Sequence, residues 1–383
     1  MNAGIKNVIR KVLYSLLSVV NVVVPKKNQI FVYAGNLLNN NSEIIVRYLG
    51  NHDYKVICMA SKHMMYRTNG NVDFVNDSVL YAIKYMMTSK VMLDSAVHRI
   101  KMRPTSSQLF LNLWHGSPLK YLAKPSRIIS DANYYTKICY AADIFKSTIQ
   151  GMFNASDSQM ILNGNLHTDY FYKNFKLPEK YRRTEINVCW MPTYRNGLGV
   201  KTTSDDIPII DRQNIHEINN YLLSNGITLF IKPHILQYNG LMNLFEGGNI
   251  SNIILITEQD FIDENIPVYG FLKCMDALIT DYSSVYFDFL LTDKPIGFAI
   301  NDFEEYKESV GYVFDNPLDY MPGQIIKTEH DLYTFFDNLR DKNDEFALER
   351  NRVMKMTNTF YDGNNCERCY QLIKQYLANL NDI

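Results

Sequence analysis

The sequence has no surplus of either charge, few cysteines and no glycine-rich nucleotide loop. Its 383 residues include 39 basic and 40 acidic side chains, a net charge of −1, which argues against a bulk nucleic-acid binder because such proteins need a basic surplus. Neither G-x-x-x-x-G-K-[ST] nor G-x-G-x-x-G occurs, so the P-loop and dinucleotide-binding classes lack support. Hydrophobic residues make up 46% and charged residues 21%, which is typical of a folded chain with room for two large domains.

Cysteines and paired carboxylates are also scarce. The six cysteines, which suit a reducing cytoplasm, are Cys58, Cys139, Cys189, Cys274, Cys366 and Cys369. Cys366 and Cys369 have C-x-x-C spacing, but no second pair of Cys or His lies near them, so we interpret them as one face of a helix rather than a zinc site. No carboxylates have the D-x-D spacing of metal-dependent transferases. We therefore expect neither a metal ion nor a cofactor.

Acidic residues are absent before Glu43, and the first 42 residues carry a charge of +5 while the remainder sums to −6. Apolar residues recur here at helical spacing: Ile5, Val8, Ile9, Val12, Leu13, Leu16, Leu17 and Val20. The uncharged run over 12–24 is shorter than the ~20 residues of a membrane span, and Pro25-Lys26-Lys27 offers no signal-peptide cleavage site. Residues 1–27 are predicted to form an amphipathic helix on an anionic membrane surface. The alternative is a helix packed on the protein's own core.

From Asn28 onward, strand-like and helix-like segments alternate, which predicts an α/β protein with doubly wound parallel sheets. We predict two Rossmann-like domains, 28–173 and 174–345, with a cleft between them, and C-terminal helices over 346–383. Expected strands are 30–33, 55–59, 72–75, 91–94, 109–114, 160–163, 186–191, 227–231, 253–256, 277–280 and 295–299, and expected helices include 42–49, 79–88, 214–224, 269–275, 284–291 and 330–338. Ligands of such sheets bind where strands end.

Two histidines follow expected strands, one in each half. His115 lies in Asn112-Leu-Trp-His-Gly-Ser-Pro-Leu-Lys120, and an imidazole with a pKa near ~6.5 is a candidate general base. The other segment, Phe230-Ile-Lys-Pro-His234, supplies Lys232 and His234, which can bind phosphate oxygens. The alternative is a structural His that closes each strand end, but two histidines in equivalent places favour a functional pair.

A third strand end, Thr280-Asp-Tyr-Ser-Ser284, opens an apolar helix. Its Ser, Thr and Asp side chains can either cap that helix or form a diphosphate cradle at its N-terminus, and the spacing leaves both open. Two more strand ends are candidates to line the cleft. One carries Thr193 and Arg195, where Arg195 is a phosphate ligand or a surface charge, and the other is Gly164-Asn-Leu-His-Thr-Asp169.

Taken together, these segments resemble the CDP-glycerol glycerophosphotransferase family, the teichoic-acid primases and polymerases. Trp114-His-Gly-Ser-Pro-Leu-Lys120 resembles W-H-G-T-P-L-K, and Met191-Pro-Thr-Tyr-Arg195 resembles A-P-T-[WF]-R. The segment 279–288 with Asp293-Lys-Pro295 resembles I-T-D-Y-S-S-x-x-F-D…D-K-P. The resemblance covers about residues 26–375, and the further matches, in order, are Lys232-Pro-His234, Asp302-Phe-Glu-Glu-Tyr306, Pro322-Gly323 and Asp362-Gly363.

The resemblance implies a GT-B-like fold. It also implies transfer of glycerol phosphate, or ribitol phosphate in some members, from a CDP-alcohol to a hydroxyl of a lipid-linked glycan or growing polymer, with release of CMP at the cytoplasmic face of the bacterial membrane. His115 would be the general base and His234 the second catalytic or phosphate-binding His. The resemblance implies that Thr280, Asp281, Ser283 and Ser284 bind the donor. We expect Lys232 and Arg195 to bind the donor phosphates as well. The residues expected to line the acceptor site or the cleft are Trp114, Gly116, Ser117, His167, Asp169 and Thr193.

The chain departs from the family pattern near residue 165. Where the family commonly has G-x-P-R-x-D, this sequence has Leu166 and His167 in place of the Pro and Arg. Two alternatives to the phosphotransferase stay open: a GT-B glycosyltransferase that uses a nucleotide sugar, and a non-catalytic relative that binds a membrane polymer. The sequence fixes neither the number of subunits nor the acceptor.

Overall fold

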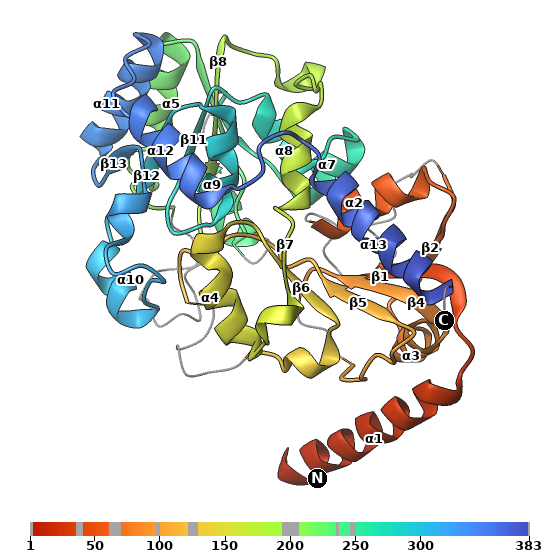
Figure 1. Cartoon of the computed structure of the whole chain (residues 1–383). Coiled ribbons are helices and arrows are strands. Elements are labelled where there is room, and N and C mark those ends of the chain that lie inside the picture. Colours follow the sequence, from red (N-terminus) through yellow and green to blue (C-terminus); the bar gives the residue numbers. More distant parts are fainter. Residues whose placement is uncertain are drawn as a thin grey trace. The chain divides into compact units, whose positions relative to one another are not determined.

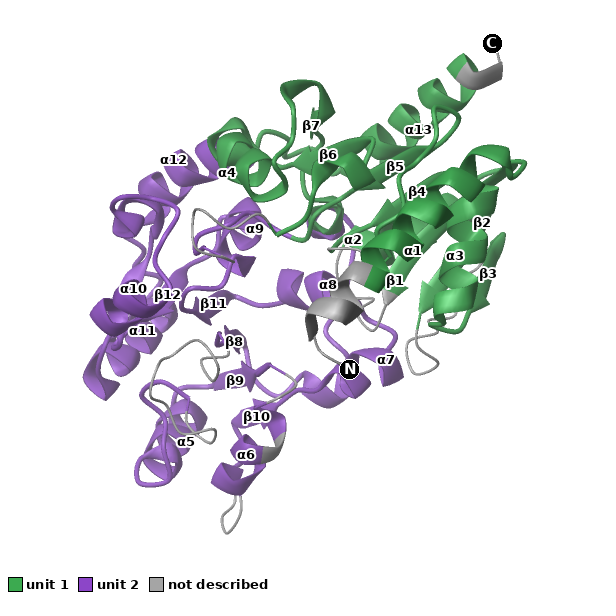
Figure 2. Ribbon diagram, turned by 90° about the horizontal axis from the view of Figure 1, so that it is seen from below, with its two compact units in different colours: residues 1–115, 125–169, 359–383 green, residues 116–124, 170–358 purple. Residues whose placement is uncertain are grey.

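The structure is a computed structural model of the whole chain (Figure 1). It describes residues 3–35, 41–60, 70–96, 100–121, 129–193, 207–234, 237–245 and 250–381. The chain forms two compact units, which Figure 2 colours separately. Unit 1 comprises residues 1–115, 125–169 and 359–383, and unit 2 comprises residues 116–124 and 170–358. The predicted boundary at 174 lies near one of the four points where the chain passes between the units.

Unit 1 contains a seven-stranded parallel sheet in the order β3-β2-β1-β4-β5-β6-β7. Its strands are β1 (Lys27–Gly35), β2 (Lys55–Ala60), β3 (Val72–Val75), β4 (Ser89–Asp94), β5 (Leu109–Asn112), β6 (Lys137–Tyr140) and β7 (Met160–Leu162). The chain moves outward from β1 to β3, returns to pair β4 with β1, and then moves outward to β7. The sheet is therefore doubly wound, with its switch point between β1 and β4.

Unit 1 also contains several helices. They are α1 (Ala3–Val23), α2 (Asn41–Gly50), α3 (Val79–Thr88), α4 (Asp143–Phe153) and α13 (Asn365–Asn381), with 3-10 helices η2 (Ala132–Tyr134), η3 (Asp157–Gln159) and η4 (Leu166–Tyr172). Helix α2 packs on β1 and β2, α3 on β1 and β4, and α4 on β6 and β7. Helix α13 packs on α2, so the last helix of the chain completes the unit that the first strands begin.

Helix α1 forms as predicted but is joined to unit 1 by polar groups rather than by its apolar stripe. Buried Asn21 donates from Nδ2 to the Arg103 carbonyl at 3.1 Å and to Gln108 Oε1 at 2.7 Å. Lys26, just beyond the helix, donates to the carbonyl of Met87 at 2.8 Å. The apolar side chains that stay exposed are Ile9, Val12, Leu13, Leu16, Val19, Val20, Val22 and Val23. Among the described helices, none is long and apolar enough to cross a membrane.

Unit 2 contains a six-stranded parallel sheet in the order β10-β9-β8-β11-β12-β13. Its strands are β8 (Ile186–Met191), β9 (Ile227–Ile231), β10 (Ile253–Leu255), β11 (Ala277–Thr280), β12 (Ile296–Ala299) and β13 (Gln324–Ile326). This sheet is also doubly wound, with its switch point between β8 and β11. One face packs on α5 and α11 through a core that includes Trp190, Leu222, Leu229 and Phe336.

The helices of unit 2 are mostly short. They are α5 (Ile215–Ser224), α6 (Tyr238–Met242), α7 (Glu258–Asp263), α8 (Val268–Lys273), α9 (Val285–Phe289), α10 (Phe303–Ser309), α11 (Glu329–Arg340) and α12 (Ala347–Thr357). The 3-10 helices are η5 (Glu179–Tyr181), η6 (Asn243–Phe245), η7 (Leu290–Thr292) and η8 (Pro317–Tyr320). Helix α11 starts with a capping box in which Thr328 accepts from the backbone N–H of Asp331 and the Asp331 carboxylate accepts from the Thr328 N–H.

Two doubly wound parallel sheets confirm the predicted fold class. Some details differ. Strand β5 ends at Asn112, two residues earlier than expected, and the helix expected over 284–291 is a five-residue α9 followed by η7. The C-terminal helices also divide between the units, because α12 belongs to unit 2 and α13 to unit 1.

Candidate active site

The predicted site residues lie where parallel strands of each sheet end. In unit 1, Ser95 follows β4, His115 follows β5 and His167 follows β7, while α2 begins beside them. In unit 2, Thr193 follows β8, His234 follows β9 and Asp281 follows β11. These are the carboxyl ends of the strands, where doubly wound sheets bind ligands.

His115 is held by its Nδ1, which lies 2.9 Å from the carbonyl oxygen of Ser95. A carbonyl can only accept, so Nδ1 carries the proton and Nε2 of the neutral ring keeps a lone pair. The side chain keeps an exposed edge, while the protein around the rest of the ring removes water and lowers the pKa of His115; the nearby His167 lowers it further. The imidazole is therefore presented as a neutral base at neutral pH.

The residue before His115 adopts an uncommon backbone conformation. Trp114 has φ of 54°, in the left-handed region that a bulky side chain rarely enters. Its N–H donates to Asn112 Oδ1 at 2.9 Å, and Asn112 Nδ2 donates to Asp94 Oδ1 at 2.6 Å. The Trp114 ring is buried against Phe153 and lies 4.1 Å from the His115 ring, centroid to centroid. Trp114 thus supports His115 and has little surface left for a ligand.

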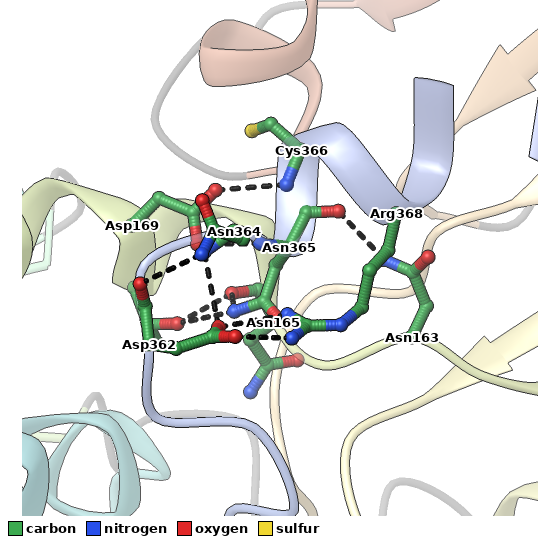
Figure 3. A network of polar contacts seen from close by, with 9 residues as sticks. Asn163, Asn165, Asp169, Asp362, Asn364, Asn365, Cys366 and Arg368 are labelled. Atoms are coloured by element: carbon green, nitrogen blue, oxygen red, sulfur yellow. Dashed lines mark hydrogen bonds and ion pairs between the residues drawn. The ribbon is translucent and has the colours of Figure 1, made fainter. Parts of the chain in front are cut away.

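Asp169 and His167, which were predicted to line a cleft, are both buried. The Asp169 carboxylate accepts from the backbone N–H groups of Asn365 at 2.9 Å and Cys366 at 2.8 Å (Figure 3). These are first-turn amides of α13, so the carboxylate caps that helix and complements its dipole. The His167 backbone N–H donates to Asn41 Oδ1 at 3.1 Å, which ties η4 to the start of α2.

In unit 2, three of the predicted side chains bind one another or the strand next to them. The Asp281 carboxylate is fully buried and accepts from the Thr193 N–H at 2.9 and 3.0 Å and from Thr193 Oγ1 at 2.5 Å. Thr280 Oγ1 donates to the Met191 carbonyl at 2.8 Å. These bonds lock the ends of β8 and β11 together at the switch point, so the side chains have a structural use whether or not a donor binds beside them. Arg195 lies outside the described residues.

Ser283 and Ser284 are half-buried and precede α9. Gly116 lies against Ser284: its φ is +146°, and a Cβ added there would lie 3.0 Å from Ser284 Oγ. Ser117 is buried. The segment continues along the edge of unit 2, where the Leu119 carbonyl accepts from the Val313 N–H at 2.9 Å. The W-H-G-S-P-L-K motif is therefore divided, with His115 in unit 1 and Gly116 onward in unit 2.

The end of β9 gathers charge. Half-buried Lys232 and exposed His234 follow the strand, and desolvation lowers the pKa of both groups. The charges of Lys232 and Lys120 lower the pKa of His234 further, while Glu258 opposes both shifts. Glu258 starts α7 after β10, directly beyond the N-cap Thr257. The sequence did not single out Glu258, because a carboxylate directly after a Thr N-cap is typical of an ordinary helix start. Lys120 lay inside one of the matched motifs but was assigned no role.

Within the part of the chain that the structure describes, no group of three or more His, Cys, Asp or Glu side chains could hold a metal ion. The polar groups at the two edges are instead an imidazole with a free lone pair in unit 1 and cationic side chains in unit 2. Chemically, such groups can accept a proton and bind phosphate oxygens.

The chain has relatives among known proteins. The chain is 24% identical to the teichoic acid poly(glycerol phosphate) polymerase of Bacillus spizizenii over 82% of this chain and 85% of that protein. It is 27% identical to the teichoic acid glycerol-phosphate primase of Bacillus subtilis. That match covers 62% of this chain and 56% of the primase, so the chain spans about half the length of that relative.

The fold has a close counterpart among solved structures. The wall teichoic acid polymerase TagF matches with a TM-score of 0.76 at 17% identity, over 99% of this chain and 97% of that chain, which supports the predicted GT-B-like class. A variant of TagF has also been solved after a soak with CDPG. The family model described as CDP-Glycerol:Poly(glycerophosphate) glycerophosphotransferase matches residues 16–375. The chain therefore belongs to this family of glycerophosphotransferases, as its motifs predicted.

Proposed function

We propose that this protein transfers a polyol phosphate, in the first instance glycerol phosphate, from a CDP-alcohol to a hydroxyl of a membrane-linked glycan or growing polymer and releases CMP. The pathway would be the synthesis of a teichoic acid or a teichoic-like capsule. Family membership supports the reaction class, and the polymerase and primase relatives support a polymer or glycan as acceptor.

The observation that carries the proposal is the contact between His115 Nδ1 and the Ser95 carbonyl oxygen. With its proton fixed on Nδ1 by the Ser95 carbonyl, Nε2 can take the proton of an acceptor hydroxyl. The hydroxyl oxygen then forms a bond to the β-phosphorus of the donor, and the bond from that phosphorus to the bridging oxygen breaks. The electron pair leaves with CMP, and the proton resides on Nε2 until solvent removes it.

The cations of unit 2 supply the other half of the chemistry. The diphosphate is highly charged, and its negative charge moves onto the leaving CMP during the reaction. The charges of Lys232 and Lys120 lie close enough to His234 to lower its pKa, and fixed cations such as these two lysines stabilise such charge without having to reorganise. A bound diphosphate also favours the charged form of Lys232, whose pKa desolvation lowers in the free protein.

The proposed reaction uses no cofactor, and the CDP-alcohol is its donor substrate. Proton removal is assigned to His115, and charge stabilisation is assigned to Lys232, His234 and the serines before α9. Turnover should therefore persist in EDTA. Activity that is lost in EDTA and restored by Mg²⁺ would contradict this assignment.

The membrane is the proposed location of the acceptor and of the enzyme. Helix α1 lies outside the sheet of unit 1 (Figure 1) with an exposed apolar stripe, in which Val19 is 69% exposed. Arg10 and Lys11 add positive charge that attracts anionic headgroups. The polar bonds of Asn21 hold the helix without covering this stripe.

Co-sedimentation with phosphatidylglycerol vesicles tests this contact. The triple change Val12→Asp, Leu16→Asp and Val19→Asp should cut the bound fraction at least several-fold. Leu348→Asp, on α12 of unit 2, is the matched control because Leu348 is 88% exposed. Equal binding by the triple variant and the control would contradict membrane docking by α1.

A donor panel tests the reaction itself. The protein is incubated with membrane-derived acceptor and, separately, with CDP-glycerol, CDP-ribitol and several nucleotide sugars, and the released nucleotide and product mass are measured. The proposal expects CMP and a product heavier by one or more polyol phosphates. Nucleotide release from a sugar donor alone would favour a glycosyltransferase, and no release with retained polymer binding would favour a non-catalytic binding protein.

A further inference from the structure

The backbone that carries His115 needs support from outside its own strand. Trp114 is in the left-handed region, a strained conformation that persists only where neighbours hold it. Asn112 holds the N–H of Trp114. The carbonyl groups of Leu113 and Trp114, which precede His115, must be held by something else, because β5 has ended.

Asn41, the first residue of α2, provides that support. Its Nδ2 donates to the Leu113 carbonyl at 3.0 Å and to the Trp114 carbonyl at 3.0 Å. Its Oδ1 accepts from the His167 backbone N–H at 3.1 Å. The side chain is fully buried, and both amide protons and the amide oxygen are engaged. No other side chain of this size offers two donors and one acceptor.

The next residue supports the other contact of His115. Ser42 Oγ lies 2.6 Å from Ser95 Oγ, and both serines are buried. Ser95 is the residue whose carbonyl binds His115 Nδ1. The start of α2 therefore supports both contacts of His115. Asn41 holds the peptide that precedes His115, and Ser42 holds Ser95, whose carbonyl fixes the tautomer.

We propose that Asn41 is a positioning residue for His115, which sets the direction and tautomer of the imidazole. This inference rests on the proposed role of His115 as the base. Asn41 holds the Trp114 carbonyl, which belongs to the same peptide group as the His115 nitrogen, so a rotation of that peptide would swing the ring away from the Ser95 carbonyl. Through its Oδ1, Asn41 also holds the start of η4, so one side chain supports the backbone at both His115 and His167.

Steady-state kinetics test the proposal. Asn41→Ala should lower kcat for CMP release by ~10–100-fold and change KM for CDP-glycerol by less than about threefold, since misorientation impairs the chemical step rather than donor binding. Asn163→Ala is the matched control, because Asn163 is buried in the same unit and its Nδ2 donates to a backbone carbonyl, that of Asn365, at 3.2 Å. Equal kcat losses in the two variants, or a loss below twofold in Asn41→Ala, would overturn the proposal.

Asn41→Asp gives a readout that a merely structural residue would not. The carboxylate keeps the shape and the acceptor but loses both donors, and it places a negative charge against the peptide of His115. The acid limb of the kcat/KM profile should therefore shift to higher pH, because a nearby negative charge favours the imidazolium. An unchanged limb at reduced kcat would contradict positioning of the base by Asn41.

The tautomer can also be read without turnover. NMR of protein with ¹⁵N-labelled histidine reports the tautomer, and the His115 signals are assigned by their loss in His115→Asn. They should show a protonated Nδ1 and an unprotonated Nε2 in the wild type and a mixture of the two tautomers in Asn41→Ala. If no CDP-alcohol is turned over, the proposed function fails while this measurement still decides the role of Asn41. If Asn41→Ala does not fold, Ser42→Ala, which removes only the contact to Ser95, should give the same mixture in milder form; an unchanged spectrum would refute the brace.

Discussion

In unit 1, neutral groups contact His115 and the backbone that carries it: a carbonyl binds Nδ1, two asparagines hold the backbone, and the aromatic ring of Trp114 lies beside the imidazole. In unit 2, the strand end at His234 is surrounded by charge, from Lys232, Lys120 and Glu258. The proposed roles would account for this difference, because a base must be oriented and kept neutral, whereas an anion site must carry positive charge. We therefore predict that substitutions near His115 in unit 1 lower the rate by misorienting the imidazole, and that substitutions near His234 in unit 2 lower it by removing positive charge.

The largest expected effect is the loss of the base. His115→Asn should lower kcat by ~10²–10⁴-fold, the usual contribution of general base catalysis. His52→Asn is the matched control, because His52 Nδ1 also lies close to a carbonyl, that of Tyr48 at 2.8 Å, yet it follows α2 away from the strand ends. CMP release by His115→Asn above a tenth of the wild-type rate would break the assignment of His115.

Removal of charge in unit 2 should cost less. Lys232→Met should lower kcat/KM for the CDP-alcohol by ~10–100-fold, since one preorganised cation is lost. Lys294→Met is the control. Desolvation lowers the pKa of Lys294 as well, but Lys294 precedes β12 instead of following a strand, and its Nζ donates to the Lys273 carbonyl at 2.8 Å. A loss in Lys294→Met as large as that in Lys232→Met would indicate that stability, not charge, sets the rate.

The pH profile sharpens the division between the units. Because the pKa of His115 lies below its ordinary ~6.5, the neutral base persists below that pH, and kcat/KM should fall only as the pH drops through the lowered pKa. The pKa of His234 is also lowered, so His234→Gln is needed to assign the limb. If the limb vanishes in His234→Gln, the titrating base belongs to unit 2 and the comparison is wrong.

The smallest expected effect concerns Asp169. Asp169→Asn leaves one amide oxygen for two backbone N–H groups of α13, and the opening free energy of that helix should fall by ~1–3 kcal/mol. Hydrogen exchange of the peptide covering 365–377 reports this directly, as exchange that is ~10-fold faster or more. Exchange at the wild-type rate would show that α13 is held without the carboxylate.

Much of the fold could be predicted from local pattern. Buried strands such as β8 and β9 are mostly apolar runs followed by polar ends, and α1 shows its stripe in the spacing of Val12, Leu16 and Val20. The motifs around His115 and His234 likewise stood at strand ends, where the structure has them. These signals depend on residues close together in sequence.

What the sequence could not provide depends on distant partners. Asp281 meets Thr193 across 88 residues, so its tie between β8 and β11 could not be told from a ligand-binding role by spacing alone. Asn41 contacts positions 72, 73 and 126 residues away. The spacing of apolar residues in α13 predicts a helix but does not show which unit the helix belongs to. In the structure α13 belongs to unit 1.

The return of α13 has a consequence for synthesis on the ribosome. Unit 2 ends at residue 358, before any residue of α13 has been added. Unit 1, although begun first, therefore waits for the last helix, and until then the carboxylate of Asp169 lacks the amides of Asn365 and Cys366. The unit that carries His115 should mature last, so a nascent chain would acquire the unit that carries Lys232 and His234 before the backbone around His115 is fixed.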